Sequence, residues 1–204
     1  KITAVDTFLV EGNCCLVKIS TNQGITGLGE GSISDNRVGT IAQCIKEFEG
    51  HLIGQDPTNI EYLWQGLYRW NRWHVGVLFS TALSAIDIAL WDIAGKVANM
   101  PIHQLLGTYR TTVRAYASST VYQQPEIYAE ESAKMKSEGW TAYKIHPPTD
   151  PELDIECCTQ IREAVGPDHT LMLDSTWSYD YPQSVRVGRA IQELNYYWYE
   201  DPLA

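Results

Sequence analysis

The sequence predicts an α+β domain followed by an α/β domain built around a parallel sheet. Two observations lead to this prediction. In residues 1–110, β-rich runs come first and a block of helical periodicity follows, whereas from residue 111 onward strands and helices alternate. The chain has 204 residues, of which 44% are hydrophobic and 20% are charged, and this is enough for two domains with cores of their own.

The first domain is expected to open with three strands. "ITAVDTFLV" and "CCLVKIST" are β-rich runs, and the turn signal "NQG" leads into the short strand "ITGLGEG". From Gly39 the apolar residues follow a helical period. The clearest helix is "STALSAIDIALWDIAGKVANMP", and a short helix is expected after Pro101. One face of the clearest helix is predicted to carry Leu83, Ile86, Leu90, Ile93 and Val97.

The second domain is expected to contain four strands that alternate with three helices. The strands are "VRAYASS", "TAYKIH", "TLMLDST" and "YYWYEDP", and the last of them reads as a buried aromatic run. Successive strand–helix units imply a parallel sheet with right-handed crossovers. A doubly wound sheet and a (β/α) barrel both satisfy this pattern. No glycine-rich phosphate turn follows the first strand, which weighs against a dinucleotide fold.

Polar residues gather where the predicted strands of this repeat end. Lys144 and His146 close the second strand and point to the same side, Asp174 closes the third, and Glu200 closes the fourth. In (β/α) barrels the carboxyl ends of the strands build the active site. Two converging carboxylates repel each other unless a cation lies between them, and Mg²⁺ suits oxygen ligands. As alternatives, the carboxylates are helix N-caps, Lys144 is a surface lysine, and His146 caps the turn before Pro147.

Composition excludes several classes of partner. The net charge is −10 and the pI is about 4.9, with no basic cluster, so neither nucleic acid nor an anionic membrane is expected to bind. No run approaches the ~18 apolar residues of a membrane span, and the start lacks a signal-peptide layout. The five cysteines, with two vicinal pairs, do not form a disulfide framework. A cytoplasmic protein is therefore expected.

The whole chain resembles the mandelate racemase/muconate lactonizing enzyme branch of the enolase superfamily. The resemblance is carried by "TNQGITGLGEG", "LIGQDPTNIEYLWQGLYR", "ALSAIDIALWDIAGKVANMPIHQLLG", "YKIH", "LMLDSTWSYD" and "WYEDPL". It implies an α+β capping domain over residues 1–110 and a modified (β/α)7β barrel, of which residues 111–204 are the first four strands. It also implies one Mg²⁺ ion and abstraction of a proton α to a carboxylate.

The resemblance also assigns roles to the four polar residues. Asp174 and Glu200 match two of the three family metal ligands, and the third is expected beyond Ala204. Lys144 and His146 match a Lys-x-Lys pair whose second lysine is commonly the acid/base. A histidine titrates near neutrality, so this substitution preserves an acid/base role but puts stereochemical analogy in doubt. Lys144 would serve mainly as a positive charge near the substrate carboxylate.

Three further residues are candidates for contact with substrate. Thr176 follows Asp174 by two residues and lies on the same side of the strand. It is expected to orient Asp174 or to touch substrate. In the capping domain, the stretch "WNRWHVG" carries Arg72 and His74, which would meet a polyhydroxy acid, while Trp70 and Trp73 would stack on a sugar face. The alternatives are a simple turn hydroxyl at Thr176 and ordinary packing of a helix connection.

The expected reaction is dehydration of an acid sugar to a 2-keto-3-deoxy acid, with general-acid help for the leaving hydroxide. The site would combine a cation with a histidine beneath a polar and aromatic cap, and its partner would be a small carboxylic acid. One alternative is a racemase or epimerase of a 2-hydroxy acid. Another, of a different class, is a non-catalytic relative that keeps the barrel as a scaffold.

The end of the sequence leads to an expectation about chain length. The chain stops two residues after Pro202, and four strands do not close a barrel, so an open apolar edge would invite association. We therefore expect the 204 residues to be the N-terminal part of a longer chain that forms a homo-oligomer. The fragment alone is expected to be inactive, to bind Mg²⁺ poorly and not to be a stable monomer.

Overall fold

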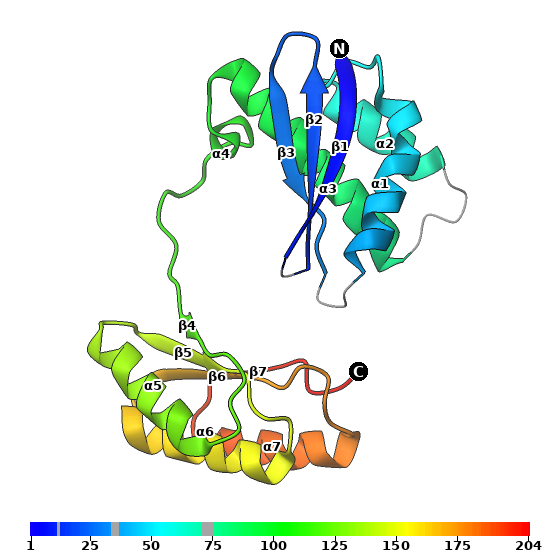
Figure 1. Cartoon of the computed structure of the whole chain (residues 1–204). Coiled ribbons are helices and arrows are strands. Elements are labelled where there is room, and N and C mark those ends of the chain that lie inside the picture. The colour runs from blue at the N-terminus through cyan, green and yellow to red at the C-terminus, as the bar shows by residue number, and fades with distance from the viewer. Residues whose placement is uncertain (12, 34–36, 71–75) are drawn as a thin grey trace. The chain divides into compact units, whose positions relative to one another are not determined.

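The structure is a computed structural model that describes residues 1–204 except residues 12, 34–36 and 71–75. The chain divides into two compact units, Lys1–Thr111 and Thr112–Ala204 (Figure 1). Each unit has its own cluster of buried apolar side chains, so each has a core of its own.

The first unit is a three-stranded antiparallel sheet with helices packed against it. The strands lie in the order β1 (Ile2–Val10), β2 (Cys14–Thr21) and β3 (Thr26–Glu30). They are followed by α1 (Val38–Leu52), α2 (Ile60–Trp70), α3 (Val77–Ala98) and the short α4 (Ile102–Leu105). The predicted order, strands first and helices afterwards, agrees with these elements.

The strand β3 and the helix α3 approach each other very closely. A Cβ atom placed on Gly29 would lie 2.0 Å from the carbonyl oxygen of Ala85, so only glycine fits at this position. One residue earlier, the backbone N–H of Leu28 donates to Oδ2 of Asp92 on α3, at 2.8 Å. The helix therefore satisfies part of the outer edge of β3, which would otherwise present unpaired backbone groups.

The helix α3 is long and apolar enough to cross a membrane, with a mean hydropathy of 1.6 over 18 residues. This qualifies the expectation that no stretch approaches a membrane span. Packing accounts for its composition, because Leu83, Ile86, Leu90 and Ile93 are buried in the core of the first unit. Val97, predicted on the same face, is 53% exposed because it lies in the last turn, one residue before the helix ends.

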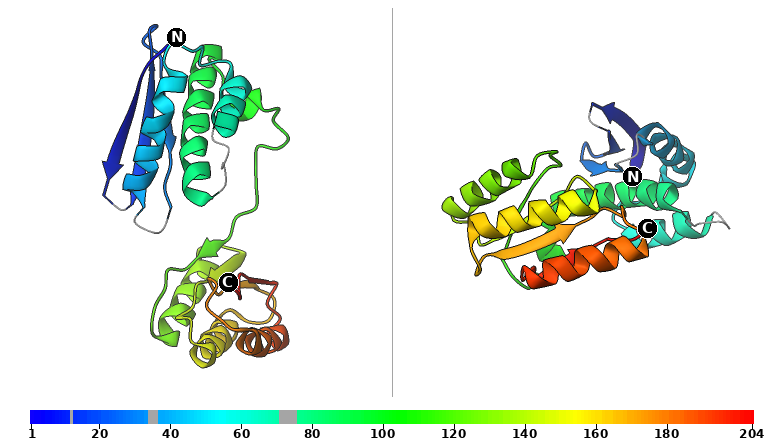
Figure 2. Two further views of the ribbon diagram at one scale, coloured as in Figure 1. Left: turned by 90° about the vertical axis from the view of Figure 1, so that its right-hand side faces the viewer. Right: turned by 90° about the horizontal axis from the view of Figure 1, so that it is seen from below.

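The second unit is a four-stranded parallel sheet with helices on one face. Its strands are β4 (Ala117–Ser118), β5 (Ala142–Ile145), β6 (Thr170–Asp174) and β7 (Trp198–Glu200), and they lie in this order. The helices α5 (Pro125–Ser137), α6 (Pro151–Val165) and α7 (Tyr181–Glu193) cover the same face (Figures 1 and 2). The described strands thus lack the reversal of order that defines a doubly wound sheet.

Side chains alternate between the two faces of this sheet. The helix-covered face carries Tyr143 and Ile145 of β5 and Leu171 and Leu173 of β6, all within the core of the second unit. The opposite face carries the alternate residues, namely Lys144, Met172, Asp174, Trp198 and Glu200. None of the described helices of the second unit covers this face (Figure 1).

The last strand differs from its prediction. The sequence run "YYWYEDP" was expected to be a buried strand, but Tyr197 is 72% exposed and only Trp198–Glu200 have strand geometry. Within the described sheet β7 is an edge strand, so one side of its aromatic run lacks a neighbour. The first predicted strand of the repeat is likewise short, with only Ala117–Ser118 paired to β5.

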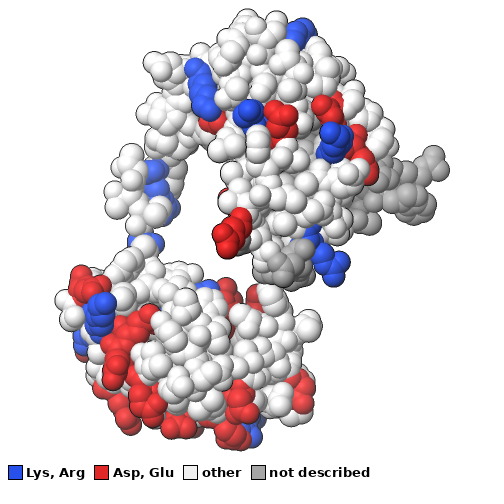
Figure 3. All heavy atoms as spheres, viewed as in Figure 1, with Lys and Arg blue, Asp and Glu red and all other residues white. Residues whose placement is uncertain are grey.

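Acidic side chains are concentrated in the second unit. It holds 15 acidic and 7 basic residues, against 10 and 8 in the first unit. The acidic side chains gather over its helical face (Figure 3). Such a surface field repels anions that approach this face.

Candidate active site

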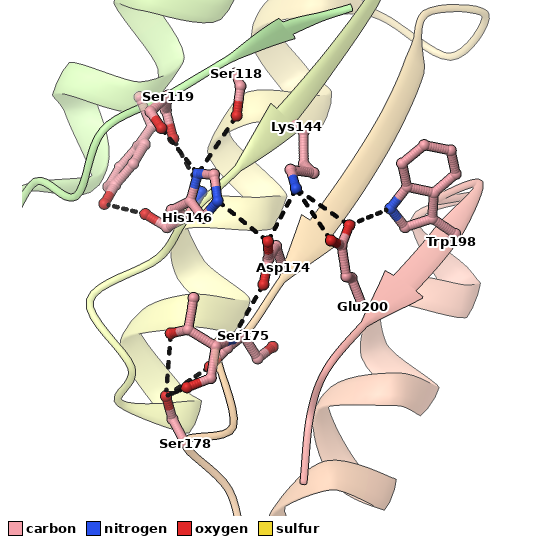
Figure 4. Close-up of polar contacts among 11 residues, drawn as sticks. Ser118, Ser119, Lys144, His146, Asp174, Ser175, Ser178, Trp198 and Glu200 are labelled. Carbon is pink, nitrogen blue, oxygen red and sulfur yellow. Dashed lines mark hydrogen bonds and ion pairs between the residues drawn. The ribbon is translucent and has the colours of Figure 1, made fainter. Parts of the chain in front are cut away.

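Four polar side chains converge at the carboxyl ends of three adjacent strands (Figure 4). The strand register places Asp174 of β6 directly beside Glu200 of β7. The ammonium of Lys144 lies 2.9 Å from Oδ2 of Asp174 and 3.1 Å from Oε2 of Glu200. Nε2 of His146 lies 3.1 Å from the same Oδ2 of Asp174. The structure therefore brings together the two predicted catalytic residues and the two predicted metal ligands.

Lys144 is buried between the two carboxylates. Only 7% of its surface is exposed, which excludes the alternative of a solvated surface lysine. Burial lowers the pKa of Lys144, but hydrogen bonds and charge from Asp174 and Glu200 outweigh this, so the net pKa lies above its usual value. The ammonium also lies 5.8 Å from the centre of the Tyr116 ring. Lys144 is therefore a fixed positive charge at neutral pH.

Asp174 is held as a carboxylate. Burial raises its pKa, but the hydrogen bonds from Lys144 and from the backbone of Thr176, together with the charge of Lys144, lower it by more, and the net pKa is below the usual value. The side chain is not an N-cap, because α7 is capped by Asp180 in a capping box with Gln183. The helix-cap alternative is therefore wrong for Asp174.

His146 is fixed through both its ring and its backbone. Nδ1 lies 2.8 Å from the carbonyl oxygen of Ser119, which only accepts, so Nδ1 carries a hydrogen. This leaves Nε2 as the nitrogen that faces Asp174. The backbone N–H of His146 donates to Oγ of Ser119 at 2.9 Å, and its carbonyl accepts from the Tyr128 hydroxyl at 2.9 Å. The ring thus reaches toward the sheet instead of capping the turn before Pro147.

Glu200 is oriented by an aromatic neighbour. The indole Nε1 of Trp198 donates to Oε2 of Glu200 at 3.1 Å, and the indole packs edge-to-face on Tyr116 with ring centres 5.6 Å apart. Sequence reasoning missed this contact, although residues two apart on one strand share a face. It also missed Ser119, whose position beside His146 depends on the pairing of β4 with β5.

Of the residues predicted to contact substrate, the structure describes Thr176 and Trp70. The backbone N–H of Thr176 donates to Oδ1 of Asp174 at 3.1 Å, and its φ of 49° lies in the left-handed region. Its backbone amide, and not its hydroxyl, therefore orients Asp174. Arg72, Trp73 and His74 lie outside the described residues. Their neighbour Trp70 packs on His51, with ring centres 4.6 Å apart.

The two carboxylates suit a hard divalent cation. They share one positive group, Lys144, and they offer the oxygen donors that Mg²⁺ prefers. In the described ranges, no group of three or more His, Cys, Asp or Glu residues is arranged to hold a metal ion. Asp174 and Glu200 alone could therefore be only part of a metal site.

Each of the two units matches the model of a known protein family. Residues 3–107 match the family model of the mandelate racemase / muconate lactonizing enzyme N-terminal domain. Residues 128–204 match the model described as enolase C-terminal domain-like. The chain therefore belongs to the mandelate racemase/muconate lactonizing enzyme family of the enolase superfamily, as its motifs predicted.

Individual relatives are named for two kinds of acid-sugar chemistry. D-galactarolactone cycloisomerase of Agrobacterium fabrum is 35% identical over 100% of this chain and 59% of its own length. A D-galactonate dehydratase family member of Streptomyces bingchenggensis is 28% identical over 98% of this chain and 57% of its own. The crystal structure of the 3,6-anhydro-D-galactonate cycloisomerase from Zobellia galactanivorans has a TM-score of 0.90 at 33% identity, covering 100% of this chain and 59% of that protein. The chain thus spans less than two thirds of the length of these relatives.

Proposed function

We propose that this chain is part of an enzyme that removes the proton α to the carboxylate of an acid sugar, with Mg²⁺ as cofactor. The observation that carries the proposal is the direct contact of Lys144 and His146 with Asp174, beside Glu200, at the carboxyl ends of adjacent strands. Relatives named as dehydratases and cycloisomerases of sugar acids and their lactones support this class of chemistry. The most direct product is a 2-keto-3-deoxy acid formed by dehydration.

Asp174 and Glu200 would hold the metal ion together with a ligand outside the described residues. When bound, Mg²⁺ supplies Lewis-acid stabilisation for the negative charge that proton removal places on the substrate carboxylate oxygens. Lys144 would bind that carboxylate, because its raised pKa keeps it charged at neutral pH. Trp198 would keep Glu200 oriented through its indole N–H.

His146 would move a proton at Nε2. The Ser119 carbonyl holds the hydrogen on Nδ1, so Nε2 is the nitrogen that gains and loses a proton. In a dehydration, a base takes the α-proton, the β carbon–oxygen bond breaks, and a proton delivered to the departing hydroxide gives water. The resulting enol then becomes the 2-keto acid. Thr176, Arg72 and His74 remain proposed contacts for the substrate hydroxyl groups.

We also propose that residues 1–110 form a capping domain and that residues 111–204 form the first four strands of a modified (β/α)7β barrel. Sequential strand order and helices on one face support a barrel. The uncovered face has a hollow of about 350 Å³, lined in part by Tyr116, Met172 and Trp198, which suits the interior of a barrel. A polypeptide limited to these 204 residues would then lack part of its site and be inactive.

Cycloisomerisation is a second candidate, favoured by the identity of 35% to a D-galactarolactone cycloisomerase. Such a reaction starts with the same proton abstraction, but the departing oxygen belongs to a ring and stays in the product. The product of a cycloisomerase therefore keeps the mass of its substrate, whereas the product of a dehydratase is lighter by one water. A racemase or epimerase of a 2-hydroxy acid would also conserve mass but would form no keto acid.

A screen of aldonic acids, aldaric acids and their lactones in the full-length protein tests the proposal. Products are scored by mass and by 2-keto acid formation, with solvent deuterium exchange at the α-carbon as a separate readout. We expect 2-keto acid formation that depends on Mg²⁺. Racemisation without keto product would refute dehydration, and absence of α-carbon exchange in every acid would favour a non-catalytic scaffold.

A further inference from the structure

A buried carboxylate near the proposed site has no role in the proposed chemistry. Asp154 lies in the first turn of α6 and is fully buried, and burial raises its pKa to about 6. No lysine, arginine or histidine among the described residues forms an ion pair with it. Burying a carboxyl group costs free energy unless the group is hydrogen-bonded. The hydrogen-bond partners of Asp154 therefore indicate its structural role.

The first partner of Asp154 lies in the loop after β5. Oδ1 of Asp154 accepts from the backbone N–H of Thr149 at 3.0 Å, and Thr149 has a left-handed φ of 74°. Two prolines, Pro147 and Pro148, separate Thr149 from His146, and their rings restrict the backbone between them. Anchoring Thr149 therefore limits where His146 can lie.

The second partner lies in the loop after β6. The hydroxyl of Tyr179 donates to Oδ2 of Asp154. The backbone N–H of Tyr179 donates to the carbonyl of Pro202, which follows β7, at 3.1 Å. In the same way, the N–H of Ser175 donates to the carbonyl of Glu200 at 3.1 Å. The loop after β6 is thus bonded to the segment after β7 and, through Tyr179, to α6.

We propose that Asp154 and Tyr179 act as a positioning pair for the proposed active site. The pair joins the loops that follow β5, β6 and β7, and so sets the spacing of His146, Asp174 and Glu200. It touches neither substrate nor ion. This inference rests on the proposed function, because it concerns the geometry of that same site.

Two matched tyrosine variants test the pair. Tyr179→Phe removes the hydroxyl that bonds Asp154 and keeps the ring. Tyr196→Phe is the control, because the Tyr196 hydroxyl donates to the carbonyl of Cys158 at 3.0 Å and packs against the same core, but reaches none of the three loops. Both variants lose one hydroxyl and its hydrogen bond, so an effect that the two variants share reports a general loss of stability and not the pair.

The readouts are Mg²⁺ affinity by calorimetry and hydrogen exchange over residues 146–150 and 175–180, both in the full-length protein. We expect Tyr179→Phe to weaken Mg²⁺ binding by about tenfold or more, as for other residues that orient metal ligands. We also expect faster exchange in both loops. Tyr196→Phe should change neither. Unchanged exchange in either loop of Tyr179→Phe, or equal effects in both variants, would overturn the pair.

Asp174→Asn separates failure of this inference from failure of the proposed site. If Asp174→Asn abolishes Mg²⁺ binding while Tyr179→Phe leaves the affinity unchanged, the site stands and the positioning pair is overturned. If the wild-type protein binds no Mg²⁺, or Asp174→Asn binds it normally, the proposed metal site fails. Hydrogen exchange in the two loops then tests the positioning pair without the Mg²⁺ measurement.

Discussion

The raised pKa of Asp154 makes a quantitative prediction about stability against pH. Its pKa rises from 3.8 to about 6 in the folded chain, through burial. Each pKa unit is worth about 1.4 kcal/mol, so ionising Asp154 in the folded state costs about 3 kcal/mol more than in the unfolded state. The pKa is raised on folding, so the contribution of Asp154 to stability is fully present below pH 3.8 and is lost as the pH rises through 6.

Asp154→Asn isolates this contribution, because asparagine has nearly the same shape and does not titrate. The free energy of unfolding of each protein is measured by urea denaturation between pH 4 and pH 7. Relative to the asparagine variant, the wild type should lose about 2.4 kcal/mol across this range, because part of the full effect is already lost at pH 4. Groups that titrate identically in both proteins cancel in the difference.

The result that would refute the reasoning is a difference that stays constant with pH. It would mean that Asp154 has an ordinary pKa in the folded chain, and that the bonds from Thr149 and Tyr179 offset the effect of burial completely. If the wild type instead gains stability relative to the asparagine variant as the pH rises, the contradiction is stronger, because the folded pKa of Asp154 would then lie below 3.8.

The other predictions concern the proposed site and the first unit. Asp174→Asn and Glu200→Gln should each weaken Mg²⁺ binding at least tenfold while leaving the fold, and calorimetry with circular dichroism checks both. His146→Asn should lower turnover by roughly 10²- to 10⁴-fold, the usual value of a general acid or base, and turnover near wild type would make His146 structural. Gly29→Ala should lower the free energy of unfolding by about 1–3 kcal/mol, because its new methyl meets the Ala85 carbonyl. The control Gly66→Ala, with open space around it in α2, should leave the stability equal or higher.

Local patterns of the sequence were enough to predict the elements and the ends of the strands at which the polar residues lie. The alternation of strands and the period of helices depend on residues a few positions apart, so both can be recognised in a sequence whose fold is not known. Lys144, Asp174 and Glu200 each close a strand, and parallel strands place such ends along one edge. Their proximity was therefore predictable before any contact was known.

Only the tertiary structure decided which side chains hold the polar residues of the candidate site in place. Ser119 reaches His146 only because β4 pairs with β5, and Asp154 meets Tyr179 from a helix that is separated from that loop by a whole strand. Neither contact leaves a periodic signal in the sequence, since each depends on how elements pack over long separations. The exposure of Val97 and Tyr197 has the same cause: burial depends on whether a neighbouring element covers a residue, and periodicity reports only which face the residue is on.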